Sequence, residues 1–198
     1  AKLAIKYGAD SITIHLREDR RHIKDQDLKK LSKYKNIPIN LEIAANMQML
    51  KIALKNKPNF VCIVPEKRKE ITTEGGLDVK KNKKKLGILL KKLFKKNIQV
   101  SLFINPNVNQ INAAKDLKVS AIELNTGLFC EKNENRTLEY EKLKSAALFA
   151  KNNNLECHAG HGITYKTVSL ISKIHEISEL NIGHFIIGES ITLGLKKT

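Results

Sequence analysis

Strict alternation of apolar and polar residues marks residues 11–17, 39–43 and 121–125 as strands. Side chains of a strand point to opposite faces with a period of two, so each segment has one apolar and one polar face. The polar faces carry Thr13, His15, Arg17, Asn40, Glu42, Glu123 and Asn125. Because charged side chains are costly to bury, polar faces that converge inside one fold predict a reaction chamber.

Helical periodicity alternates with strands along the rest of the chain. We predict helices near residues 26–34, 46–55, 79–96, 108–116, 138–152 and 164–177, and further strands at residues 60–65, 99–104, 156–159 and 184–187. Such alternation is typical of a parallel sheet covered by helices. An open doubly wound sheet would satisfy it too. The inward polar positions favour closure, so we predict an α/β fold of the (β/α)8 TIM barrel class.

The two ends of the chain leave this barrel incomplete. The chain opens in a helix that ends at Gly8, and a last helix opens at Gly188 and runs to the final residue. Seven strands are predicted, whereas a barrel of this class has about eight. We therefore expect the first strand to be missing from this chain and the last helix to be cut short. No shift in composition divides residues 1–198, so we expect a single barrel domain.

Charge adds a question about partners. The net charge is +16 over 198 residues, and lysine dominates it, most densely at Lys80, Lys81, Lys83, Lys84 and Lys85. Proteins that bind nucleic acids specifically usually add arginine and exposed aromatic residues. Here arginine is sparse, tryptophan is absent and aromatic residues make up 5%. We expect a solvated basic surface that attracts anionic small substrates, and no nucleic-acid partner.

The lengths of the apolar runs and the number of cysteines indicate the cellular compartment of the protein. No apolar run reaches the roughly 18 residues of a membrane helix, so we expect no membrane contact. Cys62, Cys130 and Cys157 are odd in number and scattered. This pattern favours a reducing compartment over a disulfide framework, and we predict a cytoplasmic protein.

Candidate catalytic residues fall where the predicted strands end, which is where barrels of this class carry their chemistry. A lone His15 could be a packed core histidine. Glu42 stands at the matching height of the next strand, however, and a buried histidine beside a carboxylate can have both pKa values moved toward neutrality. Arg17 and His22 offer cationic donors that suit phosphate.

Two loop regions are candidates for anion binding. The connection at residues 66–78 is long and includes Thr72, which is typical of a binding loop but also of a surface loop. Glycines flank His161, and Gly162 precedes a helix, where backbone amides can hold an anion. Gly183 and His184 stand at the start of the last predicted strand, and the last loops after strands in such barrels often form a phosphate site.

A metal centre is the competing chemistry for the histidines. Zinc could in principle take ligands from His15, Glu42, Cys157, His158, His161 and His184. No spacing typical of metal ligands links three of them. We therefore expect no metal.

Several segments, in this order, resemble the pyridoxine 5′-phosphate synthase family of deoxyxylulose-dependent vitamin B6 biosynthesis. The matching segments are residues 14–23, 40–42, 64–68, 72–79, 101–104, 122–124, 159–162 and 180–184. The resemblance implies a TIM barrel without cofactor or metal that forms homo-octamers. It also implies a transferase-class, ring-forming synthase. Such an enzyme condenses 1-deoxy-D-xylulose 5-phosphate with 3-amino-2-oxopropyl phosphate to pyridoxine 5′-phosphate, phosphate and water.

The resemblance also implies roles for individual residues. His15 and Glu42 would accept protons, His161 would donate one, and Glu123 would stabilise the transition state. The contacts to the pentulose phosphate would be Arg17, His22 and Thr72, and those to the amino-ketone phosphate Gly162, Gly183 and His184. Asn125, His158 and Glu189 depart from the family pattern. An alternative is a phosphate-binding barrel that is catalytically incomplete because the first strand is absent.

Overall fold

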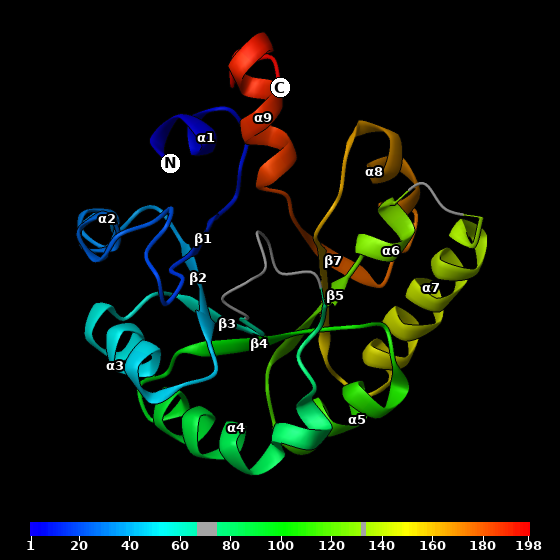
Figure 1. The fold of residues 1–198 in the computed structure, drawn as a ribbon, viewed down its shortest axis with the longest axis horizontal. Helices are drawn as coiled ribbons and strands as arrows, with labels where there is room; N and C mark the ends of the chain where they lie inside the picture. Colours follow the sequence, from blue (N-terminus) through cyan, green and yellow to red (C-terminus); the bar gives the residue numbers. More distant parts are fainter. Residues whose placement is uncertain (67–74, 132–133) are drawn as a thin grey trace.

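Seven parallel strands form one curled sheet in the computed structural model, which describes residues 1–66, 75–131 and 134–198 (Figure 1). Their order in the sheet follows the order in the chain. The strands are β1 (Ile12–His15), β2 (Ile39–Ala44), β3 (Phe60–Val64), β4 (Gln99–Ile104), β5 (Ala121–Asn125), β6 (Glu156–Gly160) and β7 (Ile177–Asn181). This consecutive parallel order with helical crossovers is the arrangement of a TIM barrel with seven of its strands.

The described residues form helices α1 (Lys2–Lys6), α2 (Asp25–Leu31), α3 (Met47–Asn56), α4 (Val79–Phe94), α5 (Val108–Asp116), α6 (Gly127–Cys130), α7 (Arg136–Asn152), α8 (Tyr165–Ile171) and α9 (His184–Leu193). Most of them line the outer, convex side of the sheet in Figure 1, whereas α1 and α9 lie at its open side and bury no residue. Local chemistry fixes several of their starts. The Asn46 side chain accepts a hydrogen bond from the Met49 N–H at 2.9 Å, and Asp78 caps α4 in the same way. Such caps satisfy backbone donors that a helix start leaves unpaired.

The main hydrophobic core lies between the sheet and these helices. The outward positions of the strands, such as Leu41, Ile122 and Leu124, are fully buried there. The inner face carries the polar positions that the alternation predicts. Thr13 of β1 donates a hydrogen bond to Oδ1 of Asn181 in β7 at 2.6 Å, which joins the two edge strands across the interior. Within the described ranges, no helix has the length and apolar character needed to cross a bilayer.

The last strand and the last helix are placed differently from the prediction. The last helix, α9, begins at His184 rather than at Gly188, and it ends at Leu193 rather than running to the final residue. The sequence predicts a strand at residues 184–187, but these residues begin α9, and the strand is Ile177–Asn181. The segment from His184 to Ile187 is apolar and β-branched and therefore looks like a strand. The segment that forms the strand contains the polar residues Glu179 and Asn181, which point to the inner face. Because of them the sequence of this segment looks less apolar than a typical strand. The helix predicted at residues 164–177 accordingly ends at Ile171.

Smaller differences concern the first strand and one helix. β1 ends at His15, so Arg17 lies in the loop that follows the strand rather than in it. The short helix α6 was not predicted, because four residues are too few to show helical periodicity. The other elements lie within a few residues of their predicted bounds.

Candidate active site

His15 and Glu42 lie side by side because β1 and β2 are parallel neighbours with these two residues in register. Nδ1 of His15 is 3.6 Å from Oε2 of Glu42. On the other side of the ring, Nε2 of His15 is 3.6 Å from Oε2 of Glu66, which follows β3. The imidazole thus lies between two carboxyl groups at the carboxyl ends of three neighbouring strands.

Burial changes the proton affinities of this pair in opposite directions. Burial, reinforced by the positive charge of Arg17, lowers the pKa of His15 to about 4. Burial raises the pKa of Glu42 to about 7. The expectation that both pKa values move toward neutrality is therefore wrong for His15, because burial and the charges of Arg17 and His22 outweigh the attraction of Asp19. Near pH 7 the ring is neutral, and Glu42 is the group that titrates.

Arg17 is held in the loop after β1 and is 3% exposed. Its Nε lies 3.6 Å from Oδ1 of Asp19 and 4.0 Å from Oε1 of Glu66. The same Glu66 oxygen accepts a hydrogen bond from the backbone N–H of Glu18 at 2.7 Å. A buried guanidinium fixed by carboxylates is a pre-oriented cation, and its planar donors suit a phosphate group.

Glu123 extends from the middle of β5 into the interior and is 2% exposed. Its Oε2 accepts a hydrogen bond from Nδ2 of Asn181 at 3.1 Å, and Sγ of Cys62 donates to it at 3.7 Å. Burial first, and then the negative charges of Glu42 and Glu179, raise the pKa of Glu123 well above its usual range. A raised pKa means that the carboxyl group holds its proton more tightly, and in its protonated form it can donate a hydrogen bond to a developing oxyanion.

The glycine before His161 makes room for this carboxyl group. A Cβ atom at Gly160 would collide with Oε1 of Glu123. His161 itself has a φ of 79°, and its carbonyl oxygen lies 2.5 Å from Oγ1 of Thr126, which donates to it. The His161 ring meets the Phe103 ring edge-on, with centroids 6.5 Å apart. The backbone around His161 is therefore anchored, and its ring is half-buried next to the interior.

The remaining predicted site residues that the structure describes are exposed. His22 is exposed in the loop of Arg17, and its charge adds to the lowering of the pKa of His15. Gly162 is exposed with a φ of 75°. Gly183 and His184 are exposed at the start of α9. Thr72 lies outside the described residues.

Two groups of the site were not predicted. Glu66 falls in a segment predicted only as a long loop, yet its side chain is 1% exposed and contacts His15. A signal was available, because Glu66 stands two residues after the end of a buried strand, where barrels of this class carry acid–base residues. Asn181 was not given a role because the strand that carries it was predicted as a loop.

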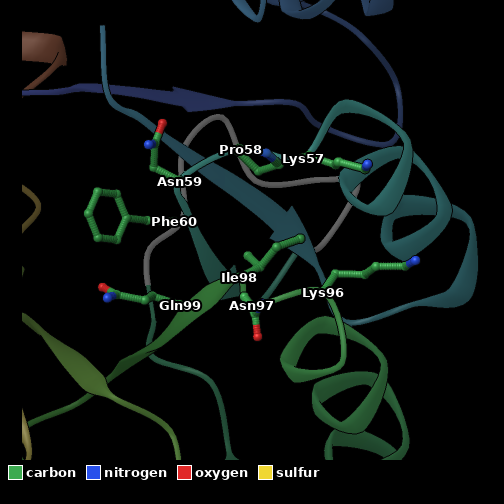
Figure 2. Close-up of a pocket in the computed structure, with 8 residues that line it drawn as sticks. All are labelled: Lys57, Pro58, Asn59, Phe60, Lys96, Asn97, Ile98 and Gln99. Carbon is green, nitrogen blue, oxygen red and sulfur yellow. The ribbon is translucent and has the colours of Figure 1, made fainter. Parts of the chain in front are cut away.

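A cavity of about 350 Å³ lies at the opposite end of β3 and β4 (Figure 2). Residues 57–60 and 96–99 line it, and none of the acid–base residues does. Among residues 1–66, 75–131 and 134–198, no three histidine, cysteine, aspartate or glutamate side chains are grouped so that they could hold a metal ion. The candidate chemistry therefore belongs to the interior cluster at the carboxyl ends of the strands.

The curled parallel sheet and this cluster together define a barrel enzyme of the (β/α)8 class. The chain belongs to the family described as pyridoxal phosphate biosynthesis protein PdxJ, whose model matches residues 1–198. The fold class and the family that the sequence predicts are thereby confirmed.

Named relatives and a solved structure agree with this assignment. A pyridoxine 5′-phosphate synthase of Pelagibacter ubique is 55% identical over 201 residues, covering 100% of this chain and 84% of its own. A pyridoxine 5′-phosphate synthase of Zymomonas mobilis is 52% identical, and the match covers 99% of this chain and 77% of that protein. The structure of a 3-keto-L-gulonate-6-phosphate decarboxylase from Vibrio cholerae has a TM-score of 0.65 at 12% identity, covering 100% of this chain and 85% of that one. At that identity the likeness supports the fold alone.

Proposed function

We propose that the protein is a pyridoxine 5′-phosphate synthase. It condenses 1-deoxy-D-xylulose 5-phosphate with 3-amino-2-oxopropyl phosphate and releases pyridoxine 5′-phosphate, phosphate and water. Relatives with this name match nearly the whole chain at about half identity. In this reaction an amine condenses with a ketone, water and phosphate leave, and an aldol-type step closes the ring. Each step moves a proton, so the site needs several acids and bases around one bound chain.

The observation that carries the proposal is the contact of 3.6 Å between His15 and Glu42 at the carboxyl ends of their strands. Glu42, with a pKa of about 7, can take up and return a proton near neutral pH. The neutral ring of His15 can accept one. We assign both as proton acceptors, His161 as the proton donor, and Glu123 as the group that stabilises the transition state.

Two phosphate positions accompany these groups in the proposal. The pentulose phosphate binds to Arg17, His22 and Thr72, and the buried guanidinium of Arg17 supports this assignment. The amino-ketone phosphate binds to Gly162, Gly183 and His184. Exposed backbone N–H groups at the start of the ten-residue helix α9 support it, since a helix start attracts anions. The net charge of +16 draws both anionic substrates toward the protein.

The test is to mix the protein with both substrates and follow product fluorescence together with released phosphate. The wild type is expected to form both products, and His15→Asn to bind the phosphorylated substrates by calorimetry without turning them over. A wild type that binds both substrates and forms no product would support the phosphate-binding barrel instead. Near-normal turnover by His15→Asn would overturn the role of that histidine.

Assembly and compartment belong to the same proposal. We infer a homo-octamer, and the exposed apolar residues Ile187 and Ile191 on α9, 63% and 84% accessible, offer surface that assembly would cover. Sedimentation velocity tests this, and a monomer at micromolar concentration would contradict it.

The three cysteines are free, which supports a reducing cytoplasmic location.

A further inference from the structure

One buried carboxyl group of the site has no role in the assignments above. Glu66 follows β3 by two residues, and its side chain is 1% exposed. Its Oε1 accepts the hydrogen bond from the Glu18 N–H at 2.7 Å and lies 4.0 Å from Nε of Arg17. These contacts connect the end of β3 to the loop after β1. Glu66 is therefore held in a fixed position, and its second oxygen is free to act elsewhere.

That second oxygen, Oε2, faces the imidazole of His15. It lies 3.6 Å from Nε2, and both atoms are buried. Within the described residues, neither atom has a hydrogen-bond partner. Buried polar atoms without partners are uncommon in folded proteins. Two such atoms that face each other slightly beyond hydrogen-bonding distance can form a hydrogen bond after a small movement of either side chain.

Only one of the two carboxyl groups beside His15 can accept a hydrogen bond from the neutral ring at a time. A neutral imidazole carries one N–H, so one ring nitrogen donates and the other accepts. Glu42 faces Nδ1 and alternates between its two protonation states near neutral pH, since its pKa is about 7. Burial also raises the pKa of Glu66, but the Glu18 N–H and the charge of Arg17 oppose that rise. Because the Glu18 N–H and Arg17 hold Glu66 in place, its Oε2 is the more rigidly positioned hydrogen-bond acceptor of the two.

We propose that Glu66 is a positioning residue that holds His15 in the tautomer with its proton on Nε2. Nδ1 then stays unprotonated and faces Glu42, with which it can exchange a proton during the reaction. A carboxylate orients the histidine of a catalytic triad in the same way. The groups that face His15 are Arg17, Asp19 and His22 from its own loop, Glu42 from β2 and Glu66 from the end of β3. The consequence for turnover depends on the proposed function, whereas the tautomer itself does not.

The first test measures the tautomer directly in the wild type. The chain has six histidines, so nitrogen NMR of protein labelled at histidine is tractable, and a His15→Asn spectrum identifies the signals of His15. The expected result near pH 7 is a neutral ring with its proton on Nε2. A proton on Nδ1 would overturn the proposal even if no variant of Glu66 folded.

The second test replaces the carboxylate by an amide of the same shape. In Glu66→Gln the amide N–H₂ can face Nε2, which favours the proton on Nδ1. We expect the NMR signals to change accordingly and kcat to fall about 10²-fold, with KM changing less than about threefold. The matched control is Glu139→Gln, which alters a largely buried carboxylate that pairs with Lys142 on α7 at 2.7 Å. It should leave kcat and the tautomer of His15 unchanged.

The two measurements separate this proposal from the proposed function. If the wild type forms no pyridoxine 5′-phosphate, the proposed function fails, and the tautomer still decides the role of Glu66. If Glu66→Gln loses kcat while the proton stays on Nε2, the positioning role is wrong. The same conclusion follows if both kcat and the tautomer are unchanged in Glu66→Gln.

Discussion

Two histidines in this protein lie between pairs of glutamates, and they differ in almost everything else. His15 has a glutamate 3.6 Å away on each side, at the carboxyl ends of the strands. His158, in β6, lies 3.3 Å from Glu156 and 3.7 Å from Glu179. These three residues border a cavity of about 80 Å³ that Phe60 and Gln99, the first residues of β3 and β4, also line. We call the first group the upper cluster and the second the lower cluster.

The difference between the clusters lies in their partners rather than in the histidines. Beside His158, the side chains of Glu156 and Glu179 are 56% and 35% exposed. The two glutamates of the upper cluster are 19% and 1% exposed. Water screens an exposed carboxylate, whereas a buried one has its proton affinity changed by the protein. A histidine–glutamate contact therefore becomes an acid–base pair only where the carboxyl group is buried at the active end of the barrel.

After the loss of turnover expected for His15→Asn, the largest effect is expected when one carboxylate of each cluster is removed in turn. Glu42→Gln keeps the shape of the side chain but cannot accept a proton, so kcat should fall by about 10³-fold. Glu156→Gln makes the same change in the lower cluster and should leave kcat within about twofold. Steady-state rates with both substrates measure this. Equal losses in the two variants would remove the distinction between the clusters.

The next effect concerns the space that Gly160 provides above Glu123. In Gly160→Ala the new methyl group would displace the carboxyl group, and a misplacement of about 1 Å costs on the order of 10²-fold in rate. The control is Gly87→Ala in α4, where a Cβ would lie 3.7 Å from Leu117, an ordinary contact. That change should raise the free energy of unfolding by about 0.5–1 kcal/mol and leave kcat unchanged. Full activity in Gly160→Ala would mean that the position of Glu123 is unimportant.

Much of the upper cluster could be predicted from sequence because period and register are local properties. Alternation in residues 11–17 and 39–43 places His15 and Glu42 on inner faces, and parallel neighbours in one sheet bring such positions together. The contact of Glu66 with His15 required more. It depends on the path of the chain after β3, which no periodicity fixes.

Two other features could not be predicted for physical reasons. Either residues 177–181 or residues 184–187 could have formed the last strand, and the outcome depends on which segment pairs with β6. Residues 177–181 form the strand, and the more apolar segment 184–187 begins a helix. The pKa of His15 depends on how deeply the ring is buried and on a cation two residues away. Sequence shows the cation but not the burial, so even the direction of the shift was predicted wrongly.

The pH dependence of kcat/KM sharpens the comparison further. Glu42 accepts a proton only when it is ionised, and its pKa is raised from 4.5 to about 7. Activity should therefore rise with pH, by about tenfold between pH 6 and pH 8. His15, with a pKa of about 4, stays neutral over this range. The midpoint should be the same in Glu156→Gln, and a wild-type midpoint near 4.5 would show that burial does not control Glu42.

The smallest effect is expected for His158→Asn in the lower cluster. His158→Asn keeps a polar side chain between Glu156 and Glu179. It also removes two buried ring nitrogens that have no hydrogen-bond partner among the described residues. The loss of packing destabilises the variant, and the removal of the unpaired buried nitrogens stabilises it. Because these two effects should nearly cancel, the free energy of unfolding in urea should change by about 1 kcal/mol or less.

In the same variant kcat should stay within about twofold, whereas His15→Asn should abolish turnover. Matched urea unfolding of the two variants separates stability from catalysis. A loss of 10²-fold in His158→Asn without unfolding would place the lower cluster in the reaction. Burial of the partner carboxylates would then not be what distinguishes the two ends of the barrel.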